Sequence, residues 1–141
     1  MRSTSAENEL ASRLRHAIAR SARRLRQEAG TDLSPTLTAA LSTIERFGPL
    51  TPTELATRER VQRPTITRVV CRLEEAGLVT RAADPADGRS ALITVTPAGR
   101  EVLDAIRTRK DAFLSARLEA LGPEDRATLE RAAALLEGML E

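Results

Sequence analysis

A cluster of arginine and threonine side chains lies in the middle of the chain, between residues 58 and 72. Its members are Arg58, Arg60, Arg63, Thr65, Thr67, Arg68 and Arg72. An arginine guanidinium can donate two parallel hydrogen bonds to the O6 and N7 atoms of guanine, and a threonine can bond phosphate or contact the thymine methyl group. The cluster therefore predicts contact with double-stranded DNA, and a merely solvated helix face is the alternative interpretation.

Two short helices joined by a tight turn are predicted to carry this cluster. Residues 50–56 read as an extended segment, a cap and the start of a helix that ends near Arg60. A second helix begins at Arg63 and Pro64, because proline favours the first turn, and it closes at Gly77. Its predicted buried face consists of Ile66, Val69, Val70 and Leu73.

A β-hairpin is predicted to follow directly, with strands at residues 78–81 and 91–96. Arg89 lies at its polar tip, where a single arginine suits a narrow minor groove. Asp84 and Asp87 would repel phosphate, so we expect them to organise the tip through backbone amides and to hold a neighbouring arginine. A catalytic or metal-binding aspartate pair is the alternative, but no third ligand lies nearby.

Helix, turn, helix and hairpin together make the winged helix-turn-helix plan, and three segments resemble the multiple antibiotic resistance regulator (MarR) family. They are residues 65–79 (TITRVVCRLEEAGLV), 84–89 (DPADGR) and 92–99 (LITVTPAG). The resemblance implies a repressor that binds a palindromic DNA operator as a homodimer. It also implies that Pro64, Thr65, Thr67 and Arg68 meet the major groove and Arg89 the minor groove, with Arg63 and Arg72 alongside. The family's wing often reads Asp-x-Arg-Asp-x-Arg, and Ala86 replaces the first arginine here.

Long amphipathic helices are predicted on both sides of this unit. The fold class is therefore mainly α with a small β-hairpin: one domain over residues 1–141, with the winged helix-turn-helix at about 34–96 and flanking helices at about 6–29 and 97–140. The resemblance implies that these flanking helices interlock two subunits. The helices that begin at Arg63, which the resemblance makes the recognition helices, would then lie about 34 Å apart. Packing on their own domain alone is the other interpretation of their apolar stripes.

The flanking helices also supply candidate effector residues, and the recognition helix holds the single cysteine. The resemblance implies release of DNA when a small phenolic or anionic ligand binds between these helices and the DNA-binding lobe. His16, Arg20 and Arg23 are the candidates for that pocket, although a lone histidine is more often solvated or packed. Cys71 is a candidate redox site beside Arg72, but it has no resolving cysteine and also suits a small helix filler.

Composition limits the other function classes. The chain is 41% hydrophobic, with no Trp or Tyr and two Phe, which predicts an aliphatic helical core. One His, one Cys and no glycine-rich phosphate loop leave no pair of nucleophile and base, so we expect no enzyme, cofactor or metal site.

No apolar run approaches the roughly 20 residues that span a bilayer, so we expect a cytoplasmic protein without a membrane partner. The remaining rival is a winged-helix module for protein interaction or non-specific DNA architecture.

Overall fold

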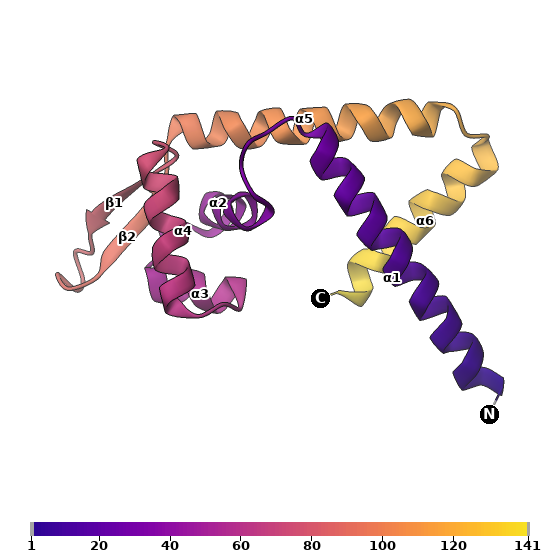
Figure 1. Cartoon of the computed structure of the whole chain (residues 1–141), viewed down its shortest axis with the longest axis horizontal. Helices are drawn as coiled ribbons and strands as arrows, with labels where there is room; N and C mark the ends of the chain where they lie inside the picture. Colours follow the sequence, from indigo (N-terminus) through magenta and orange to yellow (C-terminus); the bar gives the residue numbers. More distant parts are fainter. Residues whose placement is uncertain (1, 141) are drawn as a thin grey trace.

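The computed structural model describes residues 2–140 and forms a lobe with two helical arms (Figure 1). The chain order is four helices, a hairpin and two helices, so the predicted helix-turn-helix and hairpin have helices on both sides of them. The elements are α1 (Arg2–Glu28), α2 (Pro35–Phe47), α3 (Pro52–Glu59), α4 (Arg63–Glu75), β1 (Val79–Ala83), β2 (Ala91–Val95), α5 (Pro97–Glu119) and α6 (Pro123–Met139). The lobe consists of α2, α3, α4 and the hairpin, one arm is α1, and the other arm is the outer part of α5 with α6. The predicted fold class, mainly helical with a small antiparallel hairpin, is confirmed.

Three helices begin with the same local device, a hydroxyl cap followed by proline. The side chains of Ser34, Thr51 and Thr96 accept hydrogen bonds from the backbone N–H three residues ahead, at 3.1 to 3.2 Å. A proline follows each cap, at a position where the missing N–H leaves no helical bond unmade. These caps fix where α2, α3 and α5 begin.

The end of α4 turns the chain into the hairpin through Gly77. This residue has a φ of +75°, in the left-handed region that glycine adopts without steric cost. The Leu78 N–H then donates to the Leu73 carbonyl at 2.9 Å, which closes the helix end. The turn therefore directs β1 back along the lobe from the end of α4.

The hydrophobic core lies inside the lobe and is aliphatic. β1 pairs with β2 in antiparallel register from Val79 opposite Val95, and Leu50 extends the pairing through a bridge to Ile93. The largest fully buried side chains are Leu41, Ile44, Leu55, Ile66, Leu73, Ile93, Leu103, Val70 and Val79. The core thus joins α2, α3, α4, the hairpin and the first turns of α5.

The arms leave apolar surface uncovered. No residue of α6, whose whole length the structure describes, is buried. The exposed large apolar side chains of the arms are Leu10, Ile18, Leu114, Leu118, Leu129, Leu135, Met139 and Leu140. Arg109 of α5 fixes the end of α1 by donating to the Ala29 and Gly30 carbonyls at 2.9 and 3.0 Å. Among residues 2–140, no helix is long and apolar enough to cross a membrane.

Candidate nucleic-acid interface

The recognition helix α4 has one buried face and one polar face. Ile66, Val69, Val70 and Leu73 are buried, as predicted, and pack into the lobe core. The opposite side exposes Arg63, Pro64, Thr67, Arg68 and Arg72. The start of α4 and the tip of the hairpin lie on the side of the lobe that faces away from α5 (Figure 1). The polar face of α4 therefore begins on the same side of the lobe as the wing tip.

The turn between α3 and α4 is short because Arg60 adopts a left-handed conformation. Its φ is +55°, and its N–H donates to the Thr57 carbonyl at 3.2 Å. Val61 then donates to the Ala56 carbonyl at 3.1 Å. Within the described residues, Arg60 is the one non-glycine residue with positive φ. The left-handed conformation is sterically unfavourable for a residue with a Cβ atom, but it allows the tight reversal from α3 to α4.

The two threonines of α4 differ in what they can offer. Thr67 is exposed, and its hydroxyl donates to the Arg63 carbonyl one turn earlier at 3.1 Å, so its O–H proton is already used within the helix. Thr65 is half-buried and lines a pocket of about 270 Å³ between α2 and α4. Arg68 and Arg72 line the same pocket.

Two arginines of the predicted cluster are held by partners that the sequence pattern does not reveal. The Arg63 Nη1 donates to the Thr53 hydroxyl of α3 at 2.7 Å. The Arg58 guanidinium lies over the Phe47 ring, 3.8 Å from its centroid, and therefore ties α3 to the end of α2. Both contacts join different helices, so helical spacing within one segment gives no signal for them.

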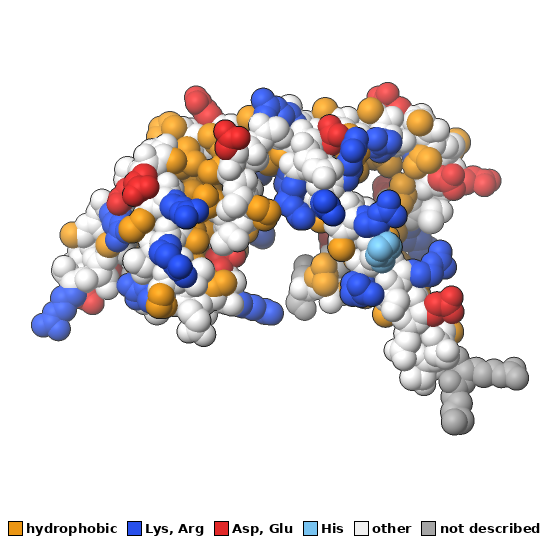
Figure 2. All heavy atoms as spheres, in the orientation of Figure 1, with side chains coloured by type: hydrophobic (Ala, Val, Ile, Leu, Met, Phe, Trp, Pro, Cys, Tyr) orange, Lys and Arg blue, Asp and Glu red, His pale blue; other side chains and the backbone are white. Residues whose placement is uncertain are grey.

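The hairpin tip is ordered by its two aspartates. Asp84 accepts a hydrogen bond from the Ala86 N–H at 2.9 Å, and Asp87 accepts one from the Arg89 N–H at 3.0 Å. Asp87 thus holds Arg89 through the backbone, and the Arg89 side chain is exposed. Figure 2 shows basic side chains at the hairpin tip and along the adjoining side of the lobe.

The wing is attached to the recognition helix by Arg81, a residue that the sequence reasoning missed. Its Nε lies 3.2 Å from the Glu74 carboxylate, and its Nη2 lies 3.5 Å from the Cys71 sulfur. Arg81 belongs to β1, whereas Glu74 and Cys71 belong to α4. Cys71, the candidate redox residue, is half-buried beneath this contact.

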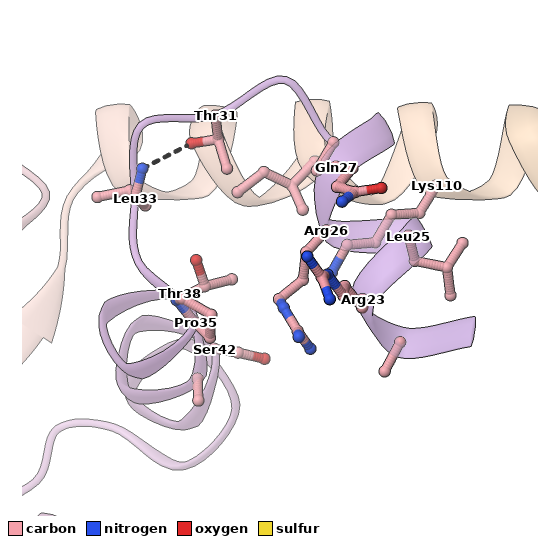
Figure 3. Close-up of a pocket in the computed structure, with 14 residues that line it drawn as sticks. Arg23, Leu25, Arg26, Gln27, Thr31, Leu33, Pro35, Thr38, Ser42 and Lys110 are labelled. Atoms are coloured by element: carbon pink, nitrogen blue, oxygen red, sulfur yellow. Dashed lines mark hydrogen bonds between the residues drawn. The ribbon is translucent and has the colours of Figure 1, made fainter. Parts of the chain in front are cut away.

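A second hollow lies between the lobe and the arms, where the candidate effector residues were expected (Figures 2 and 3). It is a pocket of about 630 Å³ between the end of α1, α2 and α5. Arg23 lines it, together with Arg26 and Lys110, which the sequence reasoning missed. Arg20 lines a different pocket against Phe113, and His16 is exposed and lines neither.

The effector residues expected from the sequence are therefore not brought together. The cause is geometric: residues 16, 20 and 23 follow one helix, but only its last turns face α2. The lining of the larger pocket contains three cations and no acidic side chain, and the rest is mostly aliphatic. Among residues 2–140, no group of three or more His, Cys, Asp or Glu side chains could hold a metal ion.

Comparisons with known proteins agree with this geometry. The sequence model of the MarR family matches residues 33–91. An uncharacterized HTH-type transcriptional regulator of Mycobacterium bovis is 38% identical and covers 94% of this chain and 93% of its own. A Pseudomonas aeruginosa protein described as a transcriptional regulator superposes with a TM-score of 0.88 at 31% identity, covering 96% of both chains.

A MarR family protein from Bacillus stearothermophilus superposes with a TM-score of 0.81 at 26% identity, covering 94% of this chain and 93% of the other. The matches span the lobe and the arms, so the similarity is not confined to the helix-turn-helix. With α4, the hairpin and the flanking helices all in the expected order, the chain belongs to the MarR family of DNA-binding transcriptional regulators.

Proposed function

We propose that the protein is a transcriptional repressor that acts in the cytoplasm and binds a palindromic operator as a homodimer. The observation that carries the proposal is that the start of α4, whose exposed face is polar, and the exposed wing tip lie on the same side of the lobe. In this arrangement α4 enters the major groove, and Arg89 reaches the adjacent minor groove. The exposed position of Arg89 on a tip ordered by Asp84 and Asp87 supports the second contact.

The residues of α4 take different parts in DNA binding. Arg68 is exposed near the middle of the polar face, where a guanidinium can reach a base edge, and we assign it base recognition. Thr67 presents its methyl group, which suits a thymine. Pro64, Thr65 and Arg72 border this surface and complete the contact with the groove walls and the phosphates.

The uncovered apolar surface of the arms supports the homodimer. Leu135 and Met139 lie one turn apart on α6 and are 59% and 68% exposed. Burying an apolar side chain stabilises by about 1.5–3 kcal/mol, so leaving a row of them in water is costly. We propose that the arms of a second copy cover them, which places the two copies of α4 about 34 Å apart on one face of the DNA.

An anionic ligand with an apolar body suits the pocket between α1, α2 and α5. Arg23, Arg26 and Lys110 supply charge, and the aliphatic lining supplies apolar contact (Figure 3). We propose that such a ligand, for example an aromatic carboxylate, releases the protein from DNA by changing how the lobe sits on the arms. A thermal-shift screen of aromatic carboxylates tests this, and Arg26→Ala should abolish the stabilisation that a hit produces in the wild type.

The decisive experiment selects bound fragments from genomic DNA and then titrates salt. A repressor of this kind enriches a palindromic site and keeps a large affinity ratio for it over random-sequence DNA as salt rises. If no site is enriched, or if both DNAs lose affinity together until the ratio is one, a non-specific architectural role replaces the proposal. Absence of any duplex binding at low salt would instead favour a protein-interaction module.

A further inference from the structure

The contact between Thr53 and Arg63 sets Arg63 apart from the other arginines proposed to meet DNA. The Arg63 Nη1 donates to the Thr53 hydroxyl oxygen at 2.7 Å, and both residues are exposed. Within residues 2–140, the guanidinium groups of Arg68, Arg72 and Arg89 form no hydrogen bond or ion pair with another side chain. Arg63 is therefore oriented before any DNA arrives.

The contact bridges the first turns of two helices. Thr53 is the second residue of α3, and Arg63 is the first residue of α4. The hydrogen bond draws the guanidinium toward the beginning of α3 and away from the middle of the polar face of α4. In the helix-turn-helix plan, the first helix crosses the DNA backbone while the second helix reads base edges. The direction of the contact thus places the Arg63 charge toward a phosphate.

The hydrogen bonding leaves the pair equipped for an anion. The Thr53 hydroxyl oxygen accepts a hydrogen bond from Arg63, so the Thr53 O–H group can still donate a hydrogen bond to an anion. The guanidinium has five N–H donors and uses one of them on Thr53. Because the long Arg63 side chain is already held, less of its conformational entropy is lost when a phosphate binds.

We propose that Thr53 is a positioning residue that holds Arg63 on a DNA backbone phosphate, so that Arg63 contributes affinity and register but no base recognition. This inference rests on the proposed insertion of α4 into the major groove. Two consequences follow. Loss of Thr53 weakens binding to all duplexes alike, and the loss depends on the presence of Arg63.

The test uses fluorescence anisotropy with a random-sequence 30-base-pair duplex and with a selected genomic fragment. Thr53→Val should weaken binding to both about 3- to 10-fold, whereas Thr53→Ser, which restores the hydroxyl, should bind like the wild type. Arg63→Ala should weaken both equally and reduce the slope of log affinity against log salt by about one. Adding Thr53→Val to Arg63→Ala should then cost nothing further. Thr57→Val, which removes the next hydroxyl along α3, is the matched control and should bind normally.

Several outcomes would overturn the inference. They are wild-type affinity for Thr53→Val, failure of Thr53→Ser to restore binding, or a Thr53→Val loss that persists without Arg63. A loss on the genomic fragment alone would show that Arg63 reads a base. Thermal unfolding of each variant checks the fold, and the Arg63→Ala salt slope tests the phosphate contact even if Thr53→Val unfolds. If the wild type binds neither duplex, the proposed function itself fails, which separates the two failures.

Discussion

The Arg107 guanidinium of α5 lies 2.8 Å from the Glu45 carboxylate of α2, and its Nη2 donates to the Ser42 hydroxyl at 3.2 Å. The contact joins the lobe to the long helix that leads into the arms. Ser42 also lines the pocket proposed for the effector. Ser42 therefore belongs both to the attachment of the lobe and to the pocket in which a ligand would act.

Replacing Arg107 by alanine should loosen this attachment at a modest cost in stability. Arg107 is 46% exposed and Glu45 is 22% exposed, so solvent weakens the ion pair. We expect the free energy of unfolding to fall by about 0.5–1 kcal/mol in urea titrations. Asp104→Asn is the matched control, because Asp104 lies 3.8 Å from the same guanidinium and is 74% exposed. An equal loss in both variants would contradict a specific role for Glu45.

Much of the fold could be predicted because its signals are local. The pairs Ser34 with Pro35 and Thr96 with Pro97 mark helix starts, and the apolar spacing from Ile66 to Leu73 marks a buried face. Each signal involves residues within one or two turns of each other. Caps and periodicity therefore specify the order and the bounds of the elements without knowledge of how they pack.

The contacts that shape the site could not be predicted in the same way. Thr53 with Arg63, Arg81 with Glu74, and Arg107 with Glu45 each join two different elements. Their geometry depends on the packing angle between those elements, which no spacing within one segment encodes. His16, Arg20 and Arg23 do not line one pocket for the same reason, since the packing of α1 against α5 decides which turn of α1 faces the pocket.

Arg68→Ala tests whether α4 reads bases. Arg68 is exposed and has no side-chain hydrogen bond within the described residues, so its guanidinium is free to fork onto a guanine. We expect a loss of about 1–3 kcal/mol on the operator, with relaxed specificity at one position and little change on random DNA. Competition binding with single-base operator variants measures this. An equal loss on both DNAs would mean that Arg68 contacts only phosphate.

Arg89→Ala and Ala86→Arg test the wing from opposite directions. Removing the exposed Arg89 should weaken operator binding while light scattering reports an unchanged dimer. Ala86 is exposed, and only its backbone N–H donates to Asp84, so an arginine at position 86 fits without disturbing the tip. The second cation should tighten operator binding. If neither change alters affinity, the wing does not contact DNA.

The dimer can be tested on α6, where large apolar side chains stay exposed in the part of the chain that the structure describes. Light scattering of the wild type should give twice the chain mass of 15.3 kDa. Leu135→Glu places a charge in the proposed interface and should yield a monomer with weaker operator binding, because one half-site is then bound alone. Glu130→Gln, on the same exposed helix, is the control and should remain dimeric. A monomeric wild type at micromolar concentration would rule out the palindromic operator.

Arg60 should show opposite effects on stability and on DNA binding when it is changed to glycine. Its φ of +55° costs about 1–2 kcal/mol for a residue with a Cβ atom, and glycine avoids that cost. Arg60→Gly should therefore raise the free energy of unfolding relative to Arg60→Ala by about 1 kcal/mol. Both variants lose the same exposed cation beside α4, so both should lose the same affinity for any duplex, with a shallower salt dependence. Equal stability of the two variants would show that the turn relaxes away from the left-handed conformation. A difference in their DNA affinity would mean that the backbone of the turn, as well as the charge, determines how α4 meets DNA.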